Sequence, residues 1–182
     1  MKKILVSPNF KDLLTPNINI GCFPDGDSHV FIPNLVKLRG QKVFLCHRLY
    51  PNQNNSLVEL ILILGLLKKE KIRPVLIVPY LPYARQDKYF LEGEAASAQE
   101  ICKLFHTLGC QKLITFDCHF LKKPGKFVFE NLPIENISLG DELIHYAQKI
   151  NPRQKLEIIA PDEGASYLVK KQGGKTCLLY TS

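Results

Sequence analysis

The stretch "VLIVPYLPYARQDK", residues 75–88, places a dense group of polar side chains directly after an apolar run. The run from Val75 to Val78 is short and apolar, which predicts a buried strand. Pro79 ends it, and the residues that follow are two tyrosines, Arg85, Gln86, Asp87 and Lys88. This group is either a solvated loop after a strand or a binding site for a phosphorylated, aromatic ligand.

Apolar runs and amphipathic segments alternate along the rest of the chain. Strands are predicted at residues 43–46, 75–78, 113–116, 134–137 and 156–160, with a final apolar stretch at 176–180. Helices are predicted at 56–70, 97–109, 138–150 and 163–172. The first two helices are expected to open with capping boxes, Ser56 with Glu59 and Ser97 with Glu100. The alternation predicts an α/β fold, a parallel sheet with helices on both of its faces.

A linker is predicted at Asn151–Pro152, because the residue before a proline disfavours helix. Residues 1–150 are then one α/β domain, and residues 151–182 are the start of a second, similar one. About 30 residues are too few to complete a doubly wound domain. We therefore expect the chain to stop inside this second domain.

Composition limits the class of function. The 182 residues are 46% hydrophobic and 23% charged, with a formal net charge of +7, which is ordinary for a soluble globular protein. No block of like charges occurs, so a nucleic-acid-binding tail is not expected, and anionic small molecules suit the excess equally well. The longest apolar run, Leu57–Leu67, is too short to span a bilayer. We expect a cytoplasmic protein with neither a membrane nor a nucleic acid as partner.

The six cysteines lack the paired spacing of a zinc site. Cys46, Cys102 and Cys118 lie in apolar stretches, where a free cysteine behaves as a small hydrophobic residue. Reduced thiols are therefore expected, as in a cytosolic protein.

Three predicted strands end in residues that can bind ligands. In open parallel sheets, ligands bind beyond the carboxyl ends of the strands. One strand leads into Arg85 and its neighbours, the next into Asp117 and His119, and a third into Asp162. Residues two apart on an extended chain point the same way, so Asp117 and His119 could face one metal ion or phosphate. The alternatives are a histidine satisfied by a local hydrogen bond and an aspartate that only caps the following helix.

The segment "FPDGD", residues 23–27, is a turn with an aromatic ring and two carboxylates. It can be an ordinary turn, or Phe23 can stack on a base while Asp25 and Asp27 accept hydrogen bonds from it or from a ribose. The chain has no glycine-rich phosphate loop of either common type. Nucleotide binding, if present, uses another arrangement.

These segments together resemble the ribose-phosphate diphosphokinases, also called phosphoribosyl diphosphate synthetases. The matching motifs are "FPDGD" at 23–27, "PYLPYARQD" at 79–87, "TFDCH" at 115–119 and "PDEG" at 161–164, in the order and spacing of that family. The resemblance covers about residues 20–172, and the segment at 83–87 is its most specific part. It implies a phosphoribosyltransferase-like parallel-sheet domain followed by a second similar one.

The resemblance also implies an activity, the transfer of the diphosphoryl group of ATP to the C1 hydroxyl of ribose 5-phosphate with Mg²⁺. ATP would then be contacted by Phe23, Asp25 and Asp27, by Arg85, Gln86 and Asp87, and by His119. The metal residues would be Asp117, His119 and Asp162, and the catalytic ones His119 and Arg85. In the family the turn at 23–27 serves the neighbouring subunit, so a homo-oligomer with shared sites is implied.

The family's phosphoribosyl-binding loop has no counterpart before Ser182, so a C-terminally truncated synthetase with weak or no activity is expected. Three other hypotheses about its function stay open. The chain could be a non-catalytic, nucleotide-binding regulatory relative, or a phosphoribosyltransferase of the same fold. A nucleic-acid binder is supported only by the net charge.

Overall fold

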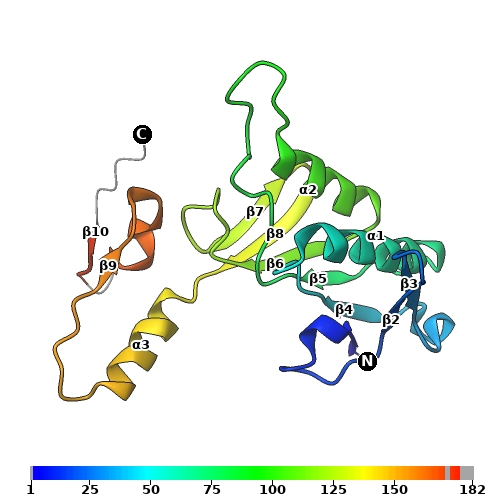
Figure 1. The fold of residues 1–182 in the computed structure, drawn as a ribbon, viewed down its shortest axis with the longest axis horizontal. Helices are drawn as coiled ribbons and strands as arrows, with labels where there is room; N and C mark the ends of the chain where they lie inside the picture. Colours follow the sequence, from blue (N-terminus) through cyan, green and yellow to red (C-terminus); the bar gives the residue numbers. More distant parts are fainter. Residues whose placement is uncertain (1, 171–172, 177–182) are drawn as a thin grey trace.

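The computed structural model describes residues 2–170 and 173–176, and its main element is a six-stranded sheet (Figure 1). The strands run in the order β1-β4-β5-β6-β8-β7. Their bounds are Lys2–Val6 for β1, Lys42–Cys46 for β4, Val75–Ile77 for β5, Lys112–Phe116 for β6, Leu132–Ile137 for β8 and Gly125–Phe129 for β7. All neighbours pair in parallel except β7, which is antiparallel to β8 at one edge. The predicted α/β fold with a parallel sheet is confirmed.

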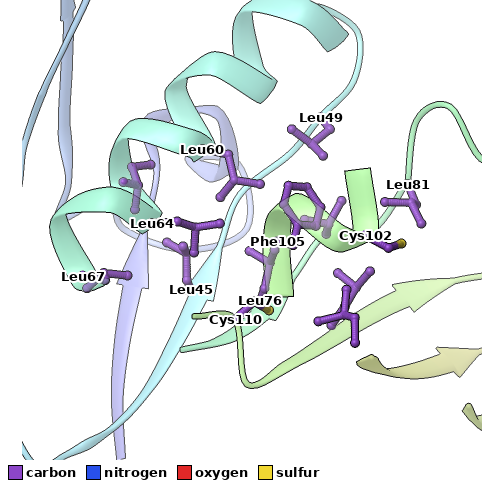
Figure 2. Packing of buried hydrophobic residues seen from close by; sticks show 14 of the residues in the cluster. Leu45, Leu49, Leu60, Leu64, Leu67, Leu76, Leu81, Cys102, Phe105 and Cys110 are labelled. Carbon is purple, nitrogen blue, oxygen red and sulfur yellow. The ribbon is translucent and has the colours of Figure 1, made fainter. Parts of the chain in front are cut away.

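The main core lies between one face of this sheet and two helices, α1 (Gln53–Lys69) and α2 (Ser97–Thr107). The strand register aligns Leu45, Leu76 and Leu113, which are fully buried. In Figure 2 the side chains of Leu60 and Leu64 from α1, and of Cys102 and Phe105 from α2, gather around Leu45 and Leu76. Burial of these apolar side chains contributes roughly 1.5–3 kcal/mol each relative to exposure.

The prediction that helices cover both faces of the sheet is wrong for the described residues. Here α1 and α2 pack on the same face, because each connects neighbouring parallel strands with the same hand of crossover (Figure 1). The connection from β6 to β8 is the strand β7 and not a helix. On the other face, a short 3₁₀ helix, η1 (Pro8–Phe10), contributes Phe10 to a small cluster with Val6 and Cys46.

The helix starts differ from the predicted capping boxes. Helix α1 begins one turn earlier, at Gln53, so Ser56 is a buried residue inside the helix and not its cap. In α2, Ser97 is the first helical residue, and its hydroxyl donates to the side chain of Gln86 instead of capping the helix. Contacts from distant segments are made by both serines, since the backbone carbonyl of Ser56 bonds to His47 and the hydroxyl of Ser97 bonds to Gln86.

Several strands were not predicted. These are β1, β7 and the antiparallel hairpin of β2 (Asn19–Cys22) and β3 (Ser28–Phe31). The hairpin packs on α1, with Val30 against the main core (Figure 1). Its turn consists of residues 23–27, so the sequence prediction of a turn there is confirmed.

The last part of the chain follows a helix, α3 (Gly140–Ile150), close to its predicted bounds. Beyond it, β9 (Ile159–Ala160) and β10 (Lys175–Thr176) pair in parallel as a separate two-stranded sheet. Between them, the predicted helix 163–172 is a 3₁₀ helix, η3 (Glu163–Leu168), and residues 171–172 and 177–180 of the predicted elements lie outside the described residues. The division into two domains at residue 150 stays a prediction. Among the described residues, no helix is long and apolar enough to cross a bilayer.

Candidate functional site

Three of the predicted site residues line one pocket of about 120 Å³. Asp117 and His119 come from the segment after β6, and Asp162 comes from the segment after β9. The full lining is Asp117, Cys118, His119, Lys122, Asp162, Gly164, Ala165, Tyr167 and Leu168. The carboxyl ends of two strands from different sheets therefore bring these residues together.

Asp117 is held by contacts on both of its carboxylate oxygens. Oδ2 accepts a hydrogen bond from the backbone N–H of Leu139 at 3.0 Å, and Oδ1 accepts one from the hydroxyl of Tyr167 at 3.3 Å. Burial raises the pKa of Tyr167 to about 12, and the negative charge of Asp117 adds to the rise. Tyr167 therefore stays protonated at neutral pH and keeps Asp117 in place.

Asp117 and His119 both line the pocket, but the predicted alternation along an extended strand is wrong for these two residues. Strand β6 ends at Phe116, and Asp117 has a φ of 41°, so the chain is not extended here. Aspartate is one of the few residues that tolerate this left-handed conformation. The turn, and not strand alternation, brings both side chains to the same hollow.

Asp162 both caps η3 and lines the pocket. Its Oδ1 accepts a hydrogen bond from the backbone N–H of Ala165 at 2.8 Å. The aspartate is exposed, and its second oxygen remains available to a ligand. The capping alternative is therefore correct, and it leaves room for the metal-binding one.

Asn136 is a supporting residue that the sequence prediction missed. It lies in β8 with an exposed fraction of only 2%. Its Oδ1 accepts from the backbone N–H of Cys118 at 2.9 Å, and its Nδ2 donates to the carbonyls of Lys123 at 2.9 Å and Leu121 at 3.5 Å. It thus fixes both ends of the loop that carries His119. A polar residue inside the predicted apolar strand 134–137 was the available signal.

The donor set is compatible with magnesium. Within the described residues, no group of three or more His, Cys, Asp or Glu side chains converges as a ready-made metal cage. Mg²⁺ is commonly held by one or two carboxylates, while substrate phosphates and water fill its other positions. Asp117 and Asp162 supply oxygen donors of this kind in one pocket. A metal role for them, and for His119, stays a prediction.

The segment that carries Arg85 does not line this pocket. The fold places Asp87 near the end of β6: burial raises the pKa of Cys118 to about 11, and the Asp87 carboxylate adds to the rise. Tyr83 has a φ of 62°, and its hydroxyl donates to Asn54 of α1. Arg85, two residues later, is exposed, so its guanidinium is free to meet a ligand.

Gln86 has a structural role that the sequence prediction did not include. Its Oε1 accepts from the hydroxyl of Ser97 at 2.9 Å, and its Nε2 donates to Glu94 at 3.0 Å. These contacts tie the start of α2 to the loop that precedes it. The amide keeps a second N–H that could reach ATP, so that contact stays a prediction. Asp87 contributes its backbone carbonyl, which accepts from Gln99 at 3.1 Å.

The turn at residues 23–27 is not among the residues that line this pocket. Phe23 is 51% exposed, and its ring packs edge-on against His29 with centroids 5.3 Å apart. Oδ1 of Asp25 accepts from the backbone N–H of Asp27 at 3.2 Å. In Figure 1 the hairpin that bears the turn lies on the side of the sheet opposite to α3. The predicted contact of this turn with ATP, in the site of a neighbouring subunit, stays a prediction.

Four of the five described cysteines are buried core residues. All five, Cys22, Cys46, Cys102, Cys110 and Cys118, are free, and all but Cys22 are buried. Burial raises the pKa of Cys102 and of Cys110 to about 12. These thiols are protonated at neutral pH, which makes them poor nucleophiles.

Comparison with known proteins agrees with this architecture. The sequence profile of the N-terminal domain of ribose phosphate pyrophosphokinase matches residues 11–109. The ribose-phosphate pyrophosphokinase of Sulfolobus acidocaldarius is 33% identical over 173 residues, which are 94% of this chain and 55% of that protein. The enzyme of that name from Methanopyrus kandleri is 34% identical over 150 residues, 82% of this chain and 49% of that protein. The chain therefore spans about half the length of the curated relatives it matches.

A solved structure has the same fold. The crystal structure of phosphoribosylpyrophosphate synthetase from Mycobacterium smegmatis superimposes with a TM-score of 0.79 at 22% identity. The superposition covers 100% of this chain and 64% of the chain in that crystal structure. The profile match extends over more than half of the residues, and it includes the turn at 23–27 and the Arg85 segment. The chain therefore belongs to the ribose-phosphate pyrophosphokinase family.

Proposed function

We propose that this chain carries the ATP- and magnesium-binding part of a ribose-phosphate diphosphokinase. The reaction is the transfer of the diphosphoryl group of ATP to the C1 hydroxyl of ribose 5-phosphate, which gives phosphoribosyl diphosphate and AMP. The observation that carries the proposal is the pocket that Asp117, His119 and Asp162 line together. Family membership and the exposed side chain of Arg85 support it.

The chemistry requires positioning and charge neutralisation more than covalent catalysis. Mg²⁺, held by Asp117 and Asp162 with His119 beside it, would neutralise the phosphates and orient them. Arg85 binds phosphate oxygens, and its planar guanidinium suits two hydrogen bonds at once. The hydrogen bonds from Leu139 and Tyr167 keep the Asp117 carboxylate from turning away from its ligand.

The nucleoside is held by the turn at 23–27 of a neighbouring copy in a homo-oligomer. The exposed ring of Phe23 offers a stacking surface for adenine. Because Oδ1 of Asp25 already accepts a hydrogen bond within the turn, Asp27 is the freer carboxylate to receive a ribose hydroxyl. This arrangement explains why the turn lies away from the pocket of its own chain.

An ATP titration in the presence of Mg²⁺ tests the proposal. Arg85→Ala and His119→Ala are each expected to weaken ATP binding at least tenfold, since each removes a charged or polar contact to the phosphates. Matched controls are Lys103→Ala and His106→Ala, which remove a cation and an imidazole from the exposed side of α2. ATP binding that is equally strong in the test and control variants would contradict the proposal.

A further inference from the structure

Lys122 lies in the same pocket as the proposed metal-binding carboxylates, although its sequence context suggests only a solvated surface lysine. The loop from Cys118 to Lys123 is fixed at both ends by the buried side chain of Asn136. Lys122 is therefore carried by an anchored loop, and its position is set by the fold.

Gly164 shows where the ammonium group of Lys122 lies. A methyl group added at Gly164 would stand 3.1 Å from Oδ1 of Asp162 and 3.2 Å from Nζ of Lys122. The ammonium and the carboxylate thus both border the space above the bare α-carbon. Their separation exceeds 4.0 Å, since Lys122 forms no ion pair with any residue that the structure describes. A ligand atom that enters the pocket at this point would lie near the ammonium of Lys122.

The charges of the pocket favour an anion at this point. Asp117 and Asp162 contribute two negative charges, which one Mg²⁺ ion balances without an excess. A polyphosphate has more negative charge than a single Mg²⁺ ion neutralises, so its binding needs a further cation in reach. Among the described residues that line the pocket, Lys122 is the only lysine or arginine.

We propose that Lys122 is a substrate-binding residue whose ammonium group contacts a phosphate oxygen of the metal-bound polyphosphate of ATP. The proposal rests on the proposed function, because it assigns a ligand contact within the same site. It also explains Gly164, whose backbone has no positive φ that would demand glycine. A side chain there would enter the space that the phosphate oxygen occupies.

The test compares Lys122→Ala with Lys123→Ala in titrations with Mg²⁺–ATP and with Mg²⁺–triphosphate. Lys123 is the adjacent exposed lysine, it does not line the pocket, and its only contact to Asn136 is through its backbone carbonyl. Lys122→Ala is expected to weaken both ligands about 5- to 20-fold, the size of one charged hydrogen bond. Lys122→Arg should retain binding within about threefold, and Lys123→Ala within about twofold. Gly164→Ala should weaken both ligands as well.

These titrations distinguish the role of Lys122 from the presence of the nucleotide site itself. If the wild-type chain binds Mg²⁺–ATP but Lys122→Ala and Lys123→Ala behave alike, the assignment of Lys122 is wrong and the nucleotide site stands. Unchanged binding by Gly164→Ala would also overturn the assignment. If the folded wild-type chain binds neither ligand, the proposed function fails, and the role of Lys122 fails with it.

Discussion

The hydroxyl of Tyr167 donates a hydrogen bond of 3.3 Å to Oδ1 of Asp117, and so joins η3 to the carboxyl end of β6. The two residues are 50 positions apart in sequence. Leu139, at the start of α3, donates to the other oxygen of the same carboxylate. One aspartate thus connects the main sheet to the two segments that follow it.

Removal of the Tyr167 hydroxyl tests this connection. Tyr167→Phe is expected to lower the free energy of unfolding by about 1 kcal/mol, the net contribution of one hydrogen bond. Amide hydrogen exchange in residues 162–169 should become faster, because η3 loses a tie to the sheet. Tyr146→Phe, at a position that is 62% exposed on α3, is the matched control and should change neither quantity. Equal exchange rates in the two variants would show that the contact does not hold η3.

His47 predicts a specific pH dependence of stability. The residue is fully buried at the end of β4, where Nδ1 lies 2.8 Å from the hydroxyl of Ser7 and Nε2 lies 2.8 Å from the carbonyl of Ser56. Because a carbonyl can only accept, Nε2 carries the proton and Nδ1 accepts from Ser7. Burial lowers the pKa of His47 from 6.5 to about 4, and the hydrogen bond to Ser56 opposes this change in part.

The direction of this pH dependence follows from the protons that the folded and the unfolded chain bind at His47. Between pH 6.5 and pH 4 the unfolded chain binds a proton at His47 and the folded chain does not, so stability falls as the pH decreases through this window. The loss is on the order of 3 kcal/mol when complete. Urea unfolding of the wild type and of His47→Gln at pH 7.5, 6 and 5 measures it. The wild type should lose more stability than the variant, and parallel losses would contradict the assignment.

Two glycines should respond to alanine in opposite directions. A methyl group at Gly140 would lie 2.7 Å from the backbone carbonyl oxygen of Leu168, so Gly140→Ala must displace η3 or α3. We expect a loss of about 1–3 kcal/mol in the free energy of unfolding. Gly65 lies inside α1 and has no atom within 4 Å of the added methyl, so Gly65→Ala should stabilise by about 0.5–1 kcal/mol. Thermal unfolding of both variants measures these two changes in stability. An unchanged stability of Gly140→Ala would show that the structure accommodates the added methyl group without cost.

The sequence was sufficient to predict the four central strands of the sheet, β4, β5, β6 and β8, because their apolar runs report burial directly. The strands that contain Leu45, Leu76 and Leu113 were all predicted within a few residues of their observed bounds. The helix starts were less predictable. Ser56 fits a capping box in sequence, but its backbone carbonyl accepts from His47 within the fold, a contact that no local pattern indicates.

The site was predictable where its residues directly follow strands, as Asp117, His119 and Asp162 do. Lys122 was not predictable, because its significance comes from Gly164 and Asp162, which are distant in sequence and come close only in the fold. Alternation along a strand also gave the wrong reason for Asp117, since the strand had already ended.

If Asp117, His119 and Asp162 form one site for magnesium-bound ATP, as we propose, the variant Asp162→Asn should reveal it. Asparagine keeps the oxygen that caps η3 but removes the negative charge, so the fold should persist. ATP would be titrated with and without Mg²⁺ into the wild type, into Asp162→Asn and into Glu163→Gln, an adjacent exposed carboxylate that does not line the pocket. We predict that Mg²⁺ strengthens ATP binding in the wild type and in Glu163→Gln. In Asp162→Asn, the factor by which Mg²⁺ strengthens ATP binding should be at least tenfold smaller than in the wild type. An enhancement by Mg²⁺ that is the same in all three proteins would show that Asp162 does not take part in binding magnesium-bound ATP.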